Sequence, residues 1–394
     1  MIYDAAIIGA GPAGLSTAII AAQNNKKVIL LEKQKTIGRK IAVTGAGRCN
    51  LLNDALSEAF YNKSAQFLVK SIFSKFGKDD ILKFFKDLGL NLYSDAGRIF
   101  PLTNQASTVT KIFGMWLDKL VVPVEFDFEV SSLSKEGDSF FIKAKNSKSM
   151  QAKKVILASG GKTYPALSSI DSLYKEAVKF GHSAVMPVPA CVPLVAKDPF
   201  CHFLQGQKIF AAAICIIDNQ VISRDEGELL FTKYGLSGTL ILDISEPISI
   251  AINRQNKKEV YVEVDLIPFL SIEELECELE KRFKNGFKPQ DLLSGILPNK
   301  FSKVLAELLD KKNTKRISTE LKAKRFKIIG TRGWNEAEFT CGGINVNEVD
   351  KETLESKLKK NLYFAGEILD VTGKRGGYNL AWAWASGAVC GKNV

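Results

Sequence analysis

Tyr3-Asp4-Ala5-Ala6-Ile7-Ile8-Gly9-Ala10-Gly11-Pro12-Ala13-Gly14 opens the chain, and Val28-Ile29-Leu30-Leu31-Glu32 follows after a run of small residues. The order is apolar strand, Gly-x-Gly-x-x-Gly turn, helix to about residue 23, and second apolar strand ending in an acid, which is the βαβ nucleotide-binding fingerprint. Gly9 permits the tight turn, Gly11 lets the backbone approach a pyrophosphate, and Gly14 allows close helix–strand packing. The stretch predicts an α/β fold with a Rossmann-like dinucleotide-binding domain.

The residues around this turn predict how the dinucleotide is held. Pro12 and Ala13 begin the helix, whose free N–H groups and positive dipole end favour phosphate. Glu32 closes the second strand and is placed to accept hydrogen bonds from a ribose diol, with Lys33 beside it. An acid at this position favours an unphosphorylated ribose.

A second segment near the other end of the chain makes FAD the predicted dinucleotide. Leu362-Tyr-Phe-Ala-Gly366-Glu367 reads as a strand ending in Gly-acid, and Gly376-Gly377-Tyr378-Asn379 opens a helix of small residues. This pattern resembles the second flavin-binding element of glutathione-reductase-type flavoproteins. The resemblance implies that Glu367 bonds the ribitol and that the helix N-terminus faces the flavin.

Three further motifs resemble a bacterial FAD-dependent oxidoreductase family that is often called BaiN-like and sometimes labelled aminoacetone oxidase. They are Lys40-Ile-Ala-Val-Thr44-Gly45-Ala46-Gly47-Arg48-Cys49-Asn50-Leu51-Leu52-Asn53, Gly227-Glu-Leu-Leu-Phe-Thr232 with Gly235-Leu-Ser-Gly238, and Thr340-Cys-Gly342-Gly343-Ile with Thr353-Leu-Glu-Ser-Lys357. They occur in family order across nearly the whole chain. The resemblance implies an FAD-dependent oxidoreductase linked to NAD(P)H.

The resemblance also implies a set of site residues beyond those already named. The additional candidates for cofactor binding are Lys40, Thr44, Gly45, Gly47, Arg48, Asn50, Val130, Ser159, Gly160 and Gly161. Arg48 and Tyr378 are the candidate catalytic residues, Arg48 as a cation beside the flavin ring and Tyr378 as a proton donor. For Tyr378, an aromatic packed on the cofactor remains the alternative.

The chain departs from the family pattern at three places. After Gly160-Gly161 the family continues with a glycine-rich stretch, but this chain has Leu167-Ser-Ser-Ile-Asp171-Ser172, which reduces backbone freedom. The family's histidine after the Leu-Phe-Thr triplet is Lys233, and its later proline is Thr239. Any role of that histidine therefore does not carry over.

Composition narrows the class of protein. The 394 residues predict two or three domains, and 46% hydrophobic with 25% charged residues is typical of a globular protein. No run approaches the roughly 20 apolar residues of a membrane helix, and no targeting signal is evident, so we expect a cytoplasmic protein without membrane contact. The seven cysteines lack metal or dithiol spacing, which predicts no metal site. Cys49 follows Arg48, which favours a thiolate, but we expect a loop residue there.

The formal charge of +11 bears on the partners. Only ten of the 54 basic residues are arginine, and the lysines are scattered rather than clustered. This disfavours nucleic acid as a partner and favours a lysine-rich surface that attracts anionic small molecules.

The pattern along the chain predicts four segments. Residues 1–188 form the first part of the FAD-binding domain, 189–268 an inserted small β-barrel or sandwich, 269–324 a helical subdomain, and 325–394 a return strand with the second part of the FAD-binding domain. Within the insert, short β-like runs are predicted at 209–217, 220–222, 228–232, 239–244 and 260–266.

The sequence leaves the electron donor and the substrate open. No second Gly-x-Gly-x-x-Gly occurs, so NAD(P)H is expected to bind only transiently beside the flavin, and a small organic substrate is the other candidate donor. Two alternatives stand beside a small-molecule oxidoreductase. One is an FAD-dependent RNA-modifying enzyme, suggested by the positive charge, and the other is a non-catalytic flavin-binding protein.

Overall fold

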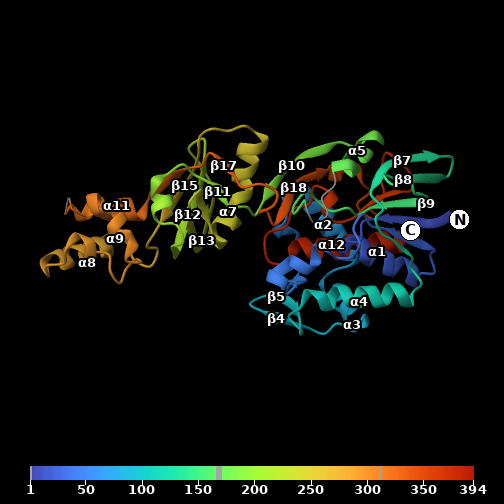
Figure 1. Ribbon diagram of the computed structural model, residues 1–394, viewed down its shortest axis with the longest axis horizontal. Coiled ribbons are helices and arrows are strands. Elements are labelled where there is room, and N and C mark those ends of the chain that lie inside the picture. Colours follow the sequence, from blue (N-terminus) through green and yellow to red (C-terminus); the bar gives the residue numbers. More distant parts are fainter. Residues whose placement is uncertain (1, 166–170, 311) are drawn as a thin grey trace. The chain divides into compact units, whose positions relative to one another are not determined.

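The computed structural model describes residues 2–165, 171–310 and 312–394. The chain divides into two compact units, which are Met1–Pro187 with Phe339–Val394 (unit 1) and Val188–Glu338 (unit 2). Both ends of the chain belong to unit 1, where the blue and red parts of the ribbon meet in Figure 1. The predicted α/β fold is confirmed.

A seven-stranded sheet forms the centre of unit 1. Its order is β6 (Val124–Glu125), β2 (Val28–Leu31), β1 (Ile2–Ile8), β9 (Ser149–Leu157), β8 (Ser139–Ala144) and β7 (Val130–Glu136), and β19 (Leu362–Phe364) also pairs with β9. The strands β6, β2, β1, β9 and β19 are mutually parallel. Residues 5–8 of β1 are fully buried, because the central strand of a covered parallel sheet has no solvent face.

Two helices of small residues join the ends of the chain. α1 (Pro12–Gln23) packs on α12 (Tyr378–Asn393), as Figure 1 shows. A Cβ on Gly387 would lie 2.2 Å from the carbonyl oxygen of Ala13, so only glycine permits this approach. Thr17 Oγ1 donates to the carbonyl of Gly387 over 2.9 Å. The two halves of the predicted cofactor site are therefore held together by direct helix contact.

The other elements of unit 1 surround this centre. Its remaining helices are α2 (Gln66–Lys75), α3 (Lys78–Asp87), α4 (Ala106–Lys119) and α5 (Asp171–Lys179). A small sheet has the order β3 (Leu52–Asn53), β5 (Arg98–Pro101) and β4 (Leu92–Asp95), and β10 (Ala184–Ala190) pairs with β18 (Phe339–Ile344).

Unit 2 contains an antiparallel sheet that closes on itself. Its order is β16 (Lys324–Lys327), β15 (Val260–Asp265), β12 (Lys208–Ile217), β13 (Gln220–Thr232), β14 (Gly235–Ser237), β11 (Leu194–Val195) and β17 (Gly330–Thr331). β16 and β17 are two residues apart in the chain, yet they pair with opposite edges of the sheet. One continuous segment thus links both edges into a barrel, which leaves few unpaired strand edges.

The helices of unit 2 are α6 (Pro199–Phe203), α7 (Thr239–Ser249), α8 (Ile272–Lys284), α9 (Lys300–Val304), α10 (Ala306–Leu309) and α11 (Thr314–Lys322). The predicted β-like run at 239–244 is wrong, because these residues begin α7. Leu240, Ile241, Ile244 and Ile248 recur at helical spacing and are buried together. Their helical periodicity outweighs the β preference of the short Leu-Ile-Leu run.

The predicted return strand lies within unit 2. Residues 325–331 pair with β15 and β11 in the barrel, and unit 2 extends to Glu338. The division of the chain into four parts otherwise stays a prediction. In the part of the chain that the structure describes, the helices are too short or too polar to span a membrane.

Candidate active site

The carboxyl ends of four adjacent parallel strands define one edge of the sheet in unit 1. β2, β1, β9 and β19 lie side by side in that order and end at residues 31, 8, 157 and 364. The residues that follow these ends are Glu32, Gly9, Ser159 and Gly366. In open α/β sheets the ligand lies outside the carboxyl ends of the strands. The topology therefore gathers four of the predicted binding segments at a single edge.

The glycine turn after β1 has the geometry that its sequence predicts. Gly9 has φ +111°, and a Cβ there would lie 2.5 Å from the carbonyl oxygen of Ala158. A Cβ on Gly14 would lie 1.8 Å from the carbonyl oxygen of Gly9. A Cβ on Gly11 would meet no atom within 4 Å. Gly9 and Gly14 are thus required for packing, whereas the space beside Gly11 is open to a ligand, with Pro12 and Ala13 starting α1.

Glu32 is held by the backbone at the end of β2. Its two carboxylate oxygens accept hydrogen bonds from the N–H groups of Ala10, at 2.7 Å, and Gln34, at 2.8 Å. The carbonyl of Glu32 accepts from the N–H of Phe128, which brings the start of β7 and the buried Val130 to this corner. Burial lowers the pKa of the neighbouring Lys33. The fixed carboxylate keeps further lone pairs for a diol.

Glu367 has partners that the sequence does not reveal. Its carboxylate accepts from the N–H of Thr340 over 2.7 Å and from the N–H of Gly161 over 3.0 Å. Lys40 Nζ lies 3.9 Å from the same carboxylate and contacts the carbonyl of Gly161. Burial is the main cause that lowers the pKa of Lys40, against the attraction of Glu367. Ser159, Gly160 and Gly161, which follow β9, are thereby tied to the segment after β19.

The loop from Lys40 to Asn50 folds tightly over this edge. It contains a 3₁₀ segment, Ile41–Gly47, in which Gly45 and Gly47 have φ of +57° and +85°. The hydroxyl of Thr44 donates to the carbonyl of Ile41. A Cβ on Gly47 would meet no atom within 4 Å, so this loop has a second open position beside its backbone.

Arg48 points to a hairpin. Its guanidinium donates to Tyr93 Oη at 2.8 Å, to Asn104 Oδ1 at 3.0 Å and to Asp95 Oδ2 at 3.2 Å, and it lies 4.1 Å from the centre of the Phe100 ring. These contacts raise the pKa of Arg48, the hydrogen bond to Tyr93 being the largest cause. The side chain joins the Lys40–Asn50 loop to β4 and β5, and its catalytic assignment stays a prediction.

The N-terminus of α12 is built from a glycine pair. Gly376 and Gly377 have φ of +127° and +105°, and a Cβ on Gly377 would lie 2.6 Å from the backbone of Leu52. Asn53, which sequence reasoning did not single out as a site residue, donates from Nδ2 to the carbonyl of Gly376. Gly366 has φ +77°, and a Cβ there would lie 2.9 Å from that of Ala13.

Tyr378 and Asn379 make protein contacts at the start of α12. The Tyr378 ring stacks on Phe60, with centroids 4.7 Å apart, and burial raises its pKa. The Asn379 amide bonds both the N–H and the carbonyl of Gly373, so it closes the loop before the helix. The proton-donor role of Tyr378 stays a prediction.

Two orphaned polar atoms test whether these residues fit a bound dinucleotide. Among the described residues, six side-chain polar atoms are buried without a hydrogen-bond partner, and Asn50 Oδ1 and Ser159 Oγ are two of them. Both belong to the predicted binding segments, and a Cβ on Gly377 would lie 2.9 Å from Asn50 Oδ1. Buried polar groups are normally satisfied, so these two atoms have hydrogen-bonding capacity that a ligand at this edge can use. Together with the open positions at Gly11 and Gly47, they fit FAD.

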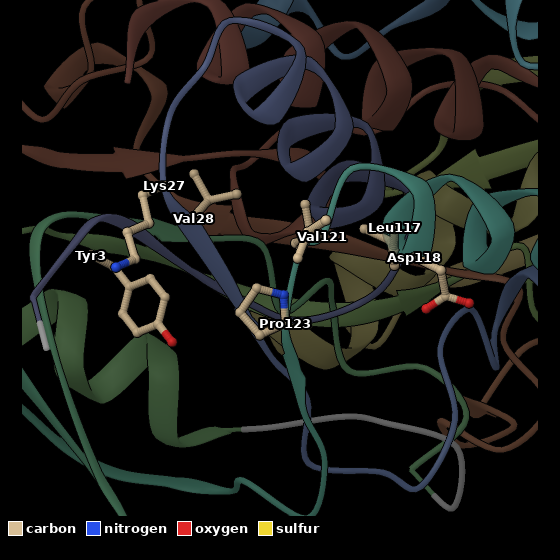
Figure 2. A pocket seen from close by; sticks show the side chains of 8 residues that line it. Tyr3, Lys27, Val28, Leu117, Asp118, Val121 and Pro123 are labelled. Atoms are coloured by element: carbon tan, nitrogen blue, oxygen red, sulfur yellow. The ribbon is translucent and has the colours of Figure 1, made fainter.

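A separate hollow lies away from this edge. Figure 2 shows Tyr3, Lys27, Val28 and Pro123 among the side chains around a pocket of about 480 Å³. Tyr3 and Val28 stand at the starts of β1 and β2, the opposite ends of the strands from the glycine turn. This pocket is not part of the site.

Cys49 does not have the character of a reactive thiol, because burial raises its pKa to about 11. The divergent loop Leu167-Ser-Ser-Ile-Asp171-Ser172 lies largely outside the described residues, and its effect on the site stays open.

The class that the fold and the site define is a flavoprotein oxidoreductase with a Rossmann-type domain and FAD as its cofactor. The match to known families is nearly complete in length. Residues 3–393 match the HI0933-like protein Rossmann domain, and the chain belongs to this family.

The chain is also similar to two full-length relatives and to one solved structure. It is 35% identical over 408 residues to a 3-dehydro-bile acid delta(4,6)-reductase of Clostridium scindens, covering 98% of this chain and 97% of the relative. It is 28% identical over 404 residues to a ribosomal RNA dihydrouridine synthase of Escherichia coli, covering 100% and 98%. The structure of a 3-ketosteroid delta1-dehydrogenase from Sterolibacterium denitrificans is similar in fold, with a TM-score of 0.51, 12% identity and coverage of 100% and 99%.

Proposed function

We propose that this FAD-dependent oxidoreductase reduces a carbon–carbon double bond that is conjugated to a carbonyl group, and that its substrate is a small organic molecule. The full-length relatives support this reaction class by their names. A 3-oxo Δ4,6 bile acid and the uracil ring of uridine both present a double bond conjugated to a carbonyl. The relative at 35% identity favours the small molecule over RNA.

The observation that carries the proposal is the gathering of the binding segments at one carboxyl edge. The N–H groups at the start of α1 and the open space at Gly11 receive a pyrophosphate, and Glu32 receives a ribose diol. The start of α12 presents a positive dipole end, which stabilises negative charge beside it. FAD, when bound, supplies two-electron transfer in the form of hydride.

The side chains around the edge fix these positions. Glu367 ties the segments after β9 and β19 together, while Lys40 compensates its charge. We propose NADH or NADPH as the electron donor. It binds transiently, because the chain has no second nucleotide fingerprint. We further propose that the protein works in the cytoplasm.

The test is turnover under anaerobic conditions. The FAD-loaded protein is incubated with NADH or NADPH and with 2-cyclohexenone, and the product is analysed by mass spectrometry. We expect the saturated ketone, two hydrogen atoms heavier, and no product from cyclohexanone. Consumption of neither donor, or equal reaction with the saturated ketone, would contradict the proposal.

RNA is the second candidate substrate, because of the ribosomal RNA dihydrouridine synthase at 28% identity and the net charge of +11. Binding to ribosomal RNA fragments that weakens steeply with salt, together with formation of dihydrouridine in those fragments, would favour it over the small molecule.

A further inference from the structure

Arg98 is a cation beside the start of α12. It opens β5 and is exposed, and in the described part of the chain its guanidinium makes no ion pair or side-chain hydrogen bond. A Cβ on Gly376 would lie 4.0 Å from Arg98 Nε. The guanidinium therefore stands next to the glycine pair that starts α12.

The small sheet directs Arg98 to the same face as several polar side chains. Arg98 pairs with Asn53 of β3 and with Asp95 of β4, while Phe100 pairs with Tyr93. Residues directly opposite each other in antiparallel strands share a face, as do alternate residues of one strand. Arg98, Asp95, Asn53, Tyr93 and Phe100 thus form one surface beside the start of α12.

The two arginines on this surface differ in their ion pairs. Asp95, the carboxylate directly across the ladder from Arg98, is bound by Arg48 at 3.2 Å. Arg48 also donates to Tyr93 and lies on the Phe100 ring. The charge of Arg48 is compensated by Asp95, whereas the described residues provide no ion pair for Arg98.

We propose that Arg98 binds the carbonyl oxygen of the conjugated substrate. The proposal rests on the proposed function. FAD, when bound and reduced by NAD(P)H, would supply a hydride to the carbon β to the carbonyl. The π electrons would then move onto the carbonyl oxygen, and Arg98 would stabilise this oxyanion. Water would protonate the α carbon, leaving hydroxide, so that the substrate gains one hydride from NAD(P)H and one proton from water.

An oxyanion is a stronger hydrogen-bond acceptor than the starting carbonyl, so a guanidinium at this position favours the transition state over the bound substrate. Losing one charged hydrogen bond slows the step about ten- to hundredfold. Ferricyanide takes electrons from reduced flavin without a carbonyl group, so its reaction measures whether the loss is confined to this step.

The experiment uses FAD-loaded protein and the variants Arg98→Gln and Arg98→Lys. Lys83→Gln is the control, since it removes one positive charge from an exposed position of α3. Each protein is reduced with dithionite under anaerobic conditions and mixed with 2-cyclohexenone or, separately, with ferricyanide. We expect Arg98→Gln to reoxidise about ten- to hundredfold more slowly with the enone and at the normal rate with ferricyanide. Arg98→Lys recovers part of the rate, and Lys83→Gln matches the parent.

A binding measurement separates this proposal from the proposed function. The oxidised holoprotein is titrated with 4-nitrophenolate, a planar oxyanion, and the change in flavin absorbance is followed. We expect Arg98→Gln to weaken binding at least tenfold. If it does so while no enone is reduced, the reaction class is wrong and Arg98 still binds an oxyanion. Equal binding and equal enone rates in Arg98→Gln and the parent would overturn the proposal, as would a parent that binds no 4-nitrophenolate.

Discussion

Gly11 and Gly14 are three residues apart in one motif, yet the structure gives them different tasks. A side chain at Gly11 meets open space, whereas one at Gly14 meets the carbonyl oxygen of Gly9 at 1.8 Å. The first glycine is kept for the ligand and the second for the packing of α1 on β1.

Replacing each of these glycines by valine should therefore affect FAD binding in one case and folding in the other. Gly11→Val is expected to lose FAD and keep the melting temperature of the flavin-free parent, because the branched side chain fills the space that a pyrophosphate approaches. Gly14→Val is expected to unfold at a much lower temperature or to fail to fold. Flavin content and thermal unfolding of the flavin-free proteins provide the measurement. A Gly11→Val protein with stoichiometric FAD would contradict the assignment.

Glu367 should matter to the protein even without its cofactor. Glu367→Ala removes the acceptor of two N–H groups, those of Gly161 and Thr340, and the counter-charge of the half-buried Lys40. We expect the flavin-free variant to lose about 1–3 kcal/mol in free energy of unfolding, the cost of leaving buried donors unpaired. Urea unfolding checks this, with Glu367→Gln as the control that keeps one acceptor. An unchanged free energy of unfolding in both would show that the contacts are weak.

At this scale the sequence predicts residue types well and partners poorly. The glycines of the fingerprint follow from their spacing, because the local turn alone requires them. The partners of Glu367 do not, since Thr340 and Gly161 lie 27 and 206 residues away along the chain. Likewise, the cationic character of Arg48 is evident, but its partners Tyr93 and Asn104 come from a separate segment.

At the scale of elements, the crossing of α1 and α12 aligns the two halves of the site. Gly387→Val would place a side chain 2.2 Å from Ala13 O and from Ser16 Oγ. We expect this variant to be destabilised by several kcal/mol and to hold FAD poorly, because overpacking forces the helices apart. Thermal unfolding and flavin titration measure both effects.

The matched control is Gly114→Ala, a glycine within α4. Its Cβ would make only an ordinary contact, 3.8 Å from Ile37 Cδ1, so this variant should be neutral or more stable by about 0.5–1 kcal/mol. If Gly387→Val were as stable as Gly114→Ala, the close crossing would not hold the site together.

A buried histidine links α5 to the chain before β19. His182 Nδ1 lies 3.1 Å from Glu348 Oε2, and Nε2 lies 2.7 Å from Ser356 Oγ. Burial lowers the pKa of His182 below 6.5, despite the opposing attraction of Glu348. The unfolded chain thus takes up this proton at higher pH than the folded protein does.

We expect the free energy of unfolding to decrease as the pH falls below 6.5. The decrease stops once the pH is below the pKa that His182 has in the folded protein. The lowered pKa of Glu348 affects the free energy of unfolding only at more acidic pH, below its ordinary value of 4.5. Urea unfolding at a series of pH values should show a shallower slope below pH 6.5 in His182→Gln than in the parent. Parallel slopes would exclude His182 as the cause.

The elements themselves divide into those with strong and weak sequence signals. The βαβ unit follows from apolar periodicity and turn residues. The helix at residues 239–244 does not follow from the sequence, because a short apolar run fits either a strand or a helix. Only the buried positions that continue to Ile248 reveal the helical spacing. Closure of the barrel through β16 and β17 depends on pairings between distant strands, which no local pattern encodes.

For the whole molecule, the division into units makes a prediction about the cofactor. All proposed FAD-binding residues belong to unit 1, and the paired strands β10 and β18 bring its two segments together where unit 2 is inserted. Replacing residues 188–338 by a short glycine–serine linker should therefore leave a folded protein that binds FAD. Circular dichroism and flavin titration check this, and a folded unit 1 without affinity for FAD would mean that unit 2 contributes to the cofactor site.

We propose that FAD at the carboxyl edge of β2, β1, β9 and β19 carries electrons to a conjugated carbonyl compound. An anaerobic stopped-flow trace tests it most directly, because it follows the flavin itself. We predict that NADH or NADPH bleaches the flavin absorbance, that 2-cyclohexenone restores it, and that cyclohexanone does not. A flavin that stays reduced with both ketones, or returns equally fast with both, would contradict the account.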